Sequence, residues 1–104
     1  MFASTFFSMK PSEALATHRT ALRQLISRYS VARPRIYGSV LTGKDDENSD
    51  LDLLVDATES TTLFTLADLE HEAQQLTGVR VSVLTPGFLS PKFRNRVLQQ
   101  AQPL

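Results

Sequence analysis

Hydrophobic residues follow a helical period in two long stretches of this chain. The first stretch predicts a helix over residues 12–29, with Ser12 as its N-cap. Its apolar positions are Leu15, Leu22, Leu25, Ile26 and Tyr29. The second stretch predicts a helix that begins after Thr61 or Thr62 and closes at Gly78, because glycine is favoured just beyond a helix end. Its apolar positions are Leu63, Leu66, Leu69, Ala73 and Leu76.

Three shorter stretches favour β-strands. Residues 35–37 form a β-prone run that ends at Gly38, where glycine implies an abrupt turn. Residues 50–56 combine leucines and a valine with aspartates, which predicts a strand with one acidic face. In residues 79–84, valines alternate with other residue types, which predicts another strand. The Ser-Pro pair at 90–91 predicts the start of a third helix. Helices that alternate with short strands predict an α/β (α+β) fold, a small mixed β-sheet with helices packed on it.

Length and composition narrow the class of protein. With 104 residues and 11.6 kDa, the chain is large enough for one domain. We assign residues 12–104 to the domain and residues 1–11 to an N-terminal tail or docking segment, in which Phe2, Phe6 and Phe7 could anchor a partner. The absence of cysteine excludes disulfides and thiolate metal sites. No apolar run approaches the ~20 residues of a membrane span and no targeting signal is evident, so we expect a cytoplasmic location.

Charge is unevenly distributed, although the formal net charge is zero. From Asp45 to Glu72 the chain has ten acidic residues and no lysine or arginine. Such a block is either a solvated surface or a set of carboxylates that includes a cation site. The zero net charge and the lack of a recognition motif argue against direct nucleic-acid binding.

The acidic strand carries the first candidate site. Asp50 and Asp52 are separated by one residue, so their side chains project from the same face of a strand, about 6 to 7 Å apart. Mg²⁺ is commonly held by one or two carboxylates together with phosphate oxygens and water. The pair therefore suits a magnesium site, although a solvated strand edge would show the same pattern.

Gly38 and Ser39 form the second candidate site. A glycine at a strand-to-helix turn lets a phosphate approach the backbone, and the following amides and the Ser39 hydroxyl can donate hydrogen bonds to it. An isolated Gly-Ser pair is usually an ordinary turn, but this one lies between a short strand and an acidic strand. The neighbouring Tyr37 either lines this site or belongs to the core, and Phe93 and Val97 fit helix-packing positions.

These segments resemble the minimal nucleotidyltransferases of the DNA polymerase beta superfamily, notably the antitoxins that pair with HEPN-domain toxins. The resemblance extends over residues 35–104. It implies a polymerase-beta-like nucleotidyltransferase fold in which Gly38 and Ser39 hold the nucleotide phosphates. It also implies that Asp50 and Asp52 bind Mg²⁺, with ATP as the substrate. Active members of this family transfer AMP from ATP to a tyrosine of the partner toxin, a HEPN ribonuclease, and so silence it.

Two positions depart from the family pattern. Thr42 stands where the family usually has an arginine, and Ser82 stands where it usually has a third carboxylate. A serine hydroxyl is a poor magnesium ligand and a poor general base. Asp56 lies about 13 Å along the strand from Asp52, too far to replace that carboxylate, and is interpreted as a turn former at the strand end.

Two hypotheses remain open. The chain is either an antitoxin with adenylyltransferase activity or a catalytically impaired antitoxin that neutralises the toxin by forming a complex with it. Both hypotheses predict a hetero-oligomer with a cognate HEPN toxin.

Overall fold

A four-stranded β-sheet organises residues 9–104, the part of the chain that the computed structural model describes. The elements in chain order are α1 (Pro11–Ser27), β1 (Val31–Tyr37), α2 (Ser39–Thr42), β2 (Leu51–Ala57), α3 (Leu63–Thr77), β3 (Val81–Leu84), the 3₁₀ helix η2 (Pro86–Phe88), α4 (Pro91–Gln100) and β4 (Gln102–Pro103). Phe2, Phe6 and Phe7 of the predicted tail lie outside the described residues. Within residues 9–104, no helix combines the length and the apolar character needed to cross a membrane.

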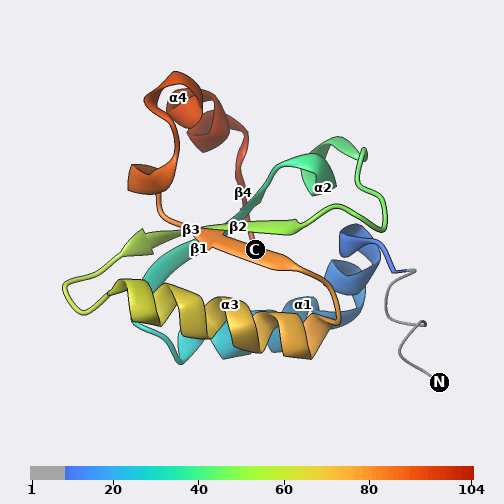
Figure 1. Ribbon diagram of the computed structural model, residues 1–104, viewed down its shortest axis with the longest axis horizontal. Helices are drawn as coiled ribbons and strands as arrows, with labels where there is room; N and C mark the ends of the chain where they lie inside the picture. The colour runs from blue at the N-terminus through green and yellow to red at the C-terminus, as the bar shows by residue number, and fades with distance from the viewer. Residues whose placement is uncertain (1–8) are drawn as a thin grey trace.

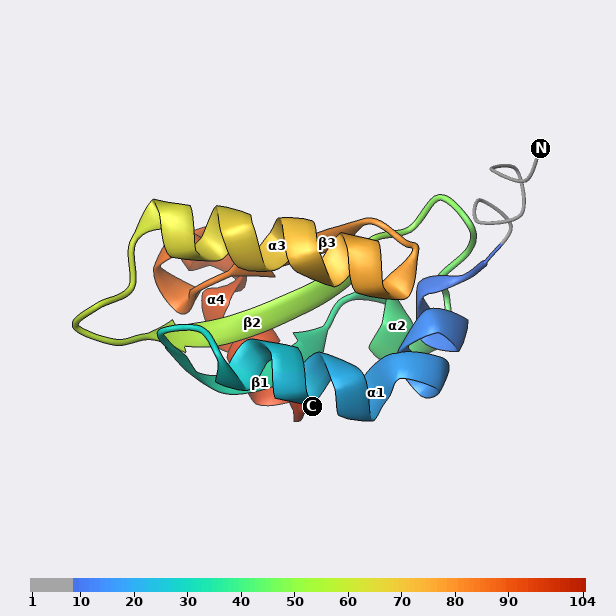
Figure 2. The ribbon, with the colours of Figure 1, turned by 90° about the horizontal axis from the view of Figure 1, so that it is seen from below.

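The sheet is mixed, with the strand order β3-β2-β1-β4. β1 runs antiparallel to both β2 and β4, and β2 runs parallel to β3. α1 and α3 lie side by side on one face of the sheet, whereas α2 and α4 lie on the opposite side (Figures 1 and 2). The expectation of a small mixed sheet with helices packed on it is therefore confirmed.

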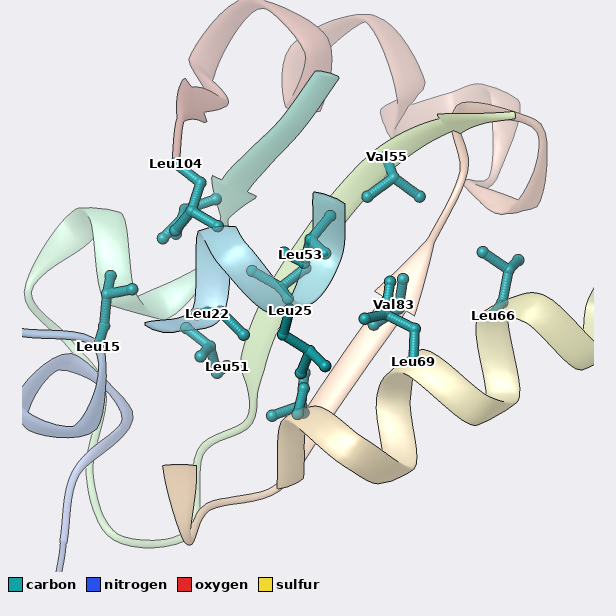
Figure 3. Close-up of a cluster of buried hydrophobic side chains, with 14 residues drawn as sticks. Leu15, Leu22, Leu25, Leu51, Leu53, Val55, Leu66, Leu69, Val83 and Leu104 are labelled. Carbon is teal, nitrogen blue, oxygen red and sulfur yellow. The ribbon is translucent and has the colours of Figure 1, made fainter. Parts of the chain in front are cut away.

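The main hydrophobic core lies between the sheet and the α1–α3 layer (Figure 3). Alternate residues of β2 point into it, so Leu51, Leu53 and Val55 are fully buried. The helical positions expected from the apolar period, among them Leu22 and Leu69, pack against these strand residues. Because strand side chains alternate, the residues between them face the α2–α4 side, where the candidate site lies.

The β3 edge of the sheet is capped by side chains of α3. The amide of Val81 donates to Oε1 of Gln74 at 3.1 Å, and the amide of Val83 donates to Oε2 of Glu70 at 3.0 Å. These bonds satisfy backbone donors that an edge strand would otherwise offer to another strand. Glu70, one of the ten acidic residues between Asp45 and Glu72, thus helps to hold β3 against α3.

Several helix boundaries confirm the sequence-based expectations. Thr62 caps α3 by accepting a hydrogen bond from the Thr65 amide, and Gly78 ends it with a left-handed φ of 76°. Ser90 caps α4 by accepting from the Lys92 amide. The prediction of Ser12 as the N-cap of α1 is wrong, because Lys10 holds that position and Pro11 is the first helical residue, where its missing amide hydrogen costs nothing.

Two strand predictions need correction. β1 is longer than the predicted 35–37, because the chain passes through Arg33 and Pro34 as a bulge in the strand. Arg33 has a φ of 48° there, and the pairing with β2 shifts register between Ala32 and Arg35. β4 is absent from the sequence-based prediction, since its two residues form a strand only through pairing with β1.

Candidate functional site

Three neighbouring strands bring a row of polar side chains together on the α2–α4 side of the sheet. In the strand register, Asp52 of β2 is opposite Tyr37 of β1 on one side and Ser82 of β3 on the other. Residues opposite one another in register have side chains on the same face of a sheet. Ser82 therefore lies directly beside Asp52, in the place where the resemblance calls for a third carboxylate.

The Asp52 carboxylate packs against Gly38. Gly38 has φ 84° and ψ −153°, a conformation that residues with a side chain rarely adopt. A Cβ atom at this position would overlap Oδ2 of Asp52 and lie 3.2 Å from its Cγ atom. Only glycine fits, because the turn is left-handed and the carboxylate fills the space beside it. The predicted phosphate turn and the predicted metal ligand are thus in contact.

The environment of Asp52 favours its neutral form. Partial burial, followed by the nearby negative charge of Asp50, raises the pKa of Asp52 to about 6. Burial and then the charge of Asp52 raise the pKa of Tyr37 to about 12. Both pKa shifts indicate a partly buried site with an excess of negative charge. A bound cation would neutralise part of that charge.

Asp50 has a cationic neighbour, Arg80, which directly precedes β3. Nε of Arg80 lies 3.1 Å from Oδ1 of Asp50, and the Arg80 guanidinium also donates to the carbonyl oxygen of Asn48. Both partners of the ion pair are well exposed, so a metal ion could displace the guanidinium at small cost. Sequence reasoning missed Arg80, although alternation in the predicted strand 79–84 already placed residue 80 on the same face as Ser82.

Ser39 begins the single turn of α2, directly after Gly38. The Ser39 carbonyl accepts from Oγ1 of Thr42 at 3.1 Å and from the amide of Lys44 at 3.1 Å. Gly43 then ends the turn with a φ of 70°. The turn is therefore closed by its own hydrogen bonds, and Thr42 contributes to that closure.

The remaining acids do not converge on the site. Asp45 accepts a hydrogen bond from the Ser12 amide at 2.8 Å and so caps the first turn of α1. Burial opposes ionisation of Asp45, but its hydrogen bonds with Ser12 outweigh this, and its pKa is lowered. Asp56 lies within β2 and forms ion pairs with Arg33 and Arg35, the second at 2.6 Å. Its interpretation as a turn former is therefore wrong.

Asp50 and Asp52 suit one magnesium ion that also binds phosphate oxygens and water. Within residues 9–104, no group of three or more His, Asp and Glu side chains is arranged to hold a metal ion. Two carboxylates are fewer protein ligands than a pair of metal ions would require. They fit an ion that reaches the site together with a nucleotide.

Known proteins share both the sequence pattern and the fold. The sequence profile of the nucleotidyltransferase domain matches residues 15–104. This chain belongs to that family. The protein adenylyltransferase MntA of Thermococcus cleftensis is 31% identical over 86 residues, which cover 83% of the nucleotidyltransferase chain and 84% of the relative. A solved structure named as a candidate minimal nucleotidyltransferase shares 41% identity at a TM-score of 0.79, covering 89% of this chain and 95% of that one.

More distant solved structures share the fold. A toxin–antitoxin complex crystallised with AMP-PNP has a TM-score of 0.69 and 17% identity, covering 81% of this nucleotidyltransferase domain and 69% of that chain. The toxin–antitoxin structure MntA-HepT has a TM-score of 0.64 and 14% identity, covering 85% and 69%. At these identities the likeness concerns the fold alone.

Proposed function

We propose that this chain is the antitoxin of a toxin–antitoxin pair and that it silences a HEPN ribonuclease toxin by transferring AMP from ATP to a toxin tyrosine, in the cytoplasm. The observation that carries the proposal is the contact between the Asp52 carboxylate and Gly38. It joins a candidate magnesium ligand to a candidate phosphate turn, which is what transfer of a nucleotidyl group requires. The relative named protein adenylyltransferase MntA and the toxin–antitoxin complex with AMP-PNP support it.

In this proposal Gly38 and Ser39 hold the phosphates, and Asp50 and Asp52 would hold Mg²⁺ beside them. The ion supplies charge neutralisation on the triphosphate. The phenolic oxygen of the toxin forms a bond to the α-phosphorus of ATP, and the bond from that phosphorus to the bridging oxygen breaks, releasing pyrophosphate. Ser82 offers no carboxylate to accept the phenolic proton, so the proton passes to solvent water.

The experiment is co-expression of the chain with the product of the adjacent gene, followed by the intact mass of that product. We expect the mass to increase by one or more adenylyl groups. The double variant Asp50→Asn plus Asp52→Asn should lose the increase, because the two metal ligands are removed. The matched control is Glu59→Gln plus Asp68→Asn, which removes the same charge from exposed positions outside the site and should keep the increase.

A second candidate function is neutralisation by binding alone. It is favoured by Ser82 in the third carboxylate position and by the ion pair that Arg80 forms with Asp50. An unmodified product that co-purifies with the chain and stays neutralised in the double variant would establish this function instead. A product that is neither modified nor bound would overturn both candidates.

The variant Ser82→Asp sharpens the distinction. It places a third carboxylate beside Asp52 and should strengthen binding of Mn²⁺, a spectroscopic substitute for Mg²⁺, by about tenfold, since an added ligand stabilises the ion. The neutral variant Ser82→Asn is the control and should leave Mn²⁺ affinity unchanged. If only Ser82→Asp modifies the toxin, the natural chain acts by binding.

A further inference from the structure

α2 and α4 lie on the same side of the sheet (Figure 1). Residues of both helices line a groove, together with Tyr37 and Gly38, which neighbour Asp52. Its volume is about 660 Å³, within the range of small-molecule sites. Tyr37 and Leu41 form part of one wall, and Phe93 and Val97 of α4 form part of the other. The groove therefore has apolar walls from elements far apart in the sequence.

α4 holds an aromatic ring at this groove without burying it. None of the residues of α4 is buried, and Phe93 is 49% exposed, contrary to the expectation that it is a helix-packing residue. Phe93 and Val97 are four residues apart and lie on one face of the helix. An apolar helical face that lines a cavity instead of the core is available to a ligand.

The position of α4 is nevertheless fixed at both ends. Arg94 donates to the carbonyl oxygens of Pro86 and Leu89 at 2.8 and 3.0 Å, which ties the start of the helix to η2. At its end, β4 pairs with β1, and Leu104 is buried in the core. The groove wall is thus set in place before a ligand arrives, which lowers the entropic cost of binding.

The groove is continuous with the candidate nucleotide site. Tyr37 and Gly38 line it, and both residues also neighbour Asp52. A nucleotide whose phosphates lie at Gly38 therefore has its sugar and base within reach of α4. We propose that this groove binds the nucleoside part of ATP, with the purine ring stacked on Phe93; the inference rests on the proposed function.

The polar residues of the groove suit this occupant. Arg96, one turn from Phe93, is the charged residue among those that line it and complements an anionic ligand. The side-chain amides of Gln100 and Gln102 offer both donors and acceptors to a base edge. A hydrophobic segment of a partner protein would leave these groups without hydrogen-bond partners.

The test uses the absence of tryptophan from the chain. In the full chain with Mg²⁺, the variant Phe93→Trp provides a single tryptophan in the groove, whose emission can be excited selectively over that of the two tyrosines. We expect ATP to quench its emission by stacking, whereas inorganic tripolyphosphate, which has no base, should bind without quenching. Leu98→Trp is the matched control, because Leu98 lies on α4, is 38% exposed and does not line the groove, so its emission should not respond.

Calorimetry of Phe93→Ala completes the test. Loss of base stacking should weaken ATP binding by about tenfold or more, while affinity for tripolyphosphate stays at the wild-type value. Equal affinity of Phe93→Ala and wild type for ATP would overturn the groove proposal alone. Equal weakening for ATP and tripolyphosphate, or loss of toxin binding with unchanged ATP affinity, would also overturn it.

Failure of the proposed function has a different signature. A wild-type chain that binds neither ATP nor tripolyphosphate in the presence of Mg²⁺ would overturn both the function and the groove proposal. Binding of ATP and tripolyphosphate by the wild-type chain thus tests the proposed function, and the Phe93 variants test the groove proposal.

Discussion

The two faces of the sheet are built on opposite principles. On the α1–α3 face, alternate residues of β2 are fully buried and packed by leucines of two long helices. On the other face, the intervening residues are Asp52, which contacts Gly38, the buried Leu54, and Asp56, which pairs with arginines of β1. One strand thus supplies only apolar side chains to the core on one side, and two carboxylates together with a buried leucine on the other.

The contrast assigns stability and chemistry to different sides of one element. Leu53 and Asp52 are neighbours in sequence, yet the first is enclosed by the core and the second touches Gly38 beside a groove. A carboxylate in the α1–α3 layer would be buried without a partner, at a cost of several kcal/mol. The thin cover of the α2–α4 side leaves room for a ligand, and the packed side keeps the strand rigid.

The largest effect that tests this contrast is expected on the packed face. Leu53→Ala should lower the free energy of unfolding by about 3 to 5 kcal/mol, because it removes buried methyl groups and leaves a cavity. Leu63→Ala is the control, since Leu63 is 68% exposed and the change should stay within about 0.5 kcal/mol. Urea denaturation measures both. Equal effects of the two variants would contradict the assignment of stability to this face.

A smaller loss of stability is expected at Gly38, where the Asp52 carboxylate leaves no room for a side chain. Gly38→Ala should lower the free energy of unfolding by about 2 to 3 kcal/mol and abolish Mg–ATP binding, because a side chain strains the turn and displaces the Asp52 carboxylate. Gly43→Ala separates the two causes. Gly43 also has a positive φ, of 70°, but a Cβ atom there would meet no other atom within 4 Å, so the change should cost roughly 1 kcal/mol and keep binding. Intact ATP binding in Gly38→Ala would break the proposed link between the turn and the carboxylate.

The periodic parts of the fold are predictable from sequence because their signals are local. The spacing of Leu63, Leu66 and Leu69, with a threonine cap before and Gly78 after, predicts α3 closely. β4 carries no such signal, since two residues become a strand only when β1 lies beside them. Phe93 shows the same limit, because its spacing suits a packed helix and only the fold reveals a groove in front of it.

The sequence predicts which residues belong to the candidate site better than it predicts which of them are in contact. Strand alternation places Asp50 and Asp52 on one face, and the glycine before Ser39 indicates a special turn. The contact of Gly38 with Asp52 depends on the pairing of β1 with β2, which the local sequence does not specify. The same is true of Arg80, whose partner Asp50 is brought to it by the parallel pairing of β2 with β3.

The smallest expected effect is the pH dependence of the free energy of unfolding, to which Asp52 and Asp45 should contribute with opposite signs. Asp52 has a pKa of about 6 in the folded chain and about 4 when unfolded, so the folded state binds more protons between these values. The free energy of unfolding therefore falls as the pH rises from 4 to 6. Asp52→Asn should stabilise the metal-free chain at pH 7.5, by an amount that solvent screening limits to the order of 1 kcal/mol, and the gain should vanish below about pH 4.

Asp45 should behave in the opposite way. The pKa of Asp45 is lowered because hydrogen bonds with Ser12 outweigh the effect of burial, so its charge stabilises the fold above about pH 4 and the contribution is lost as the pH falls. Asp45→Asn should therefore destabilise the chain at pH 7.5 and have little effect at low pH. Urea denaturation with EDTA, from low pH to 7.5, measures both variants. If they change stability in the same direction at pH 7.5, the distinction between a structural carboxylate that caps α1 and a ligand-binding carboxylate kept at a cost to stability does not hold.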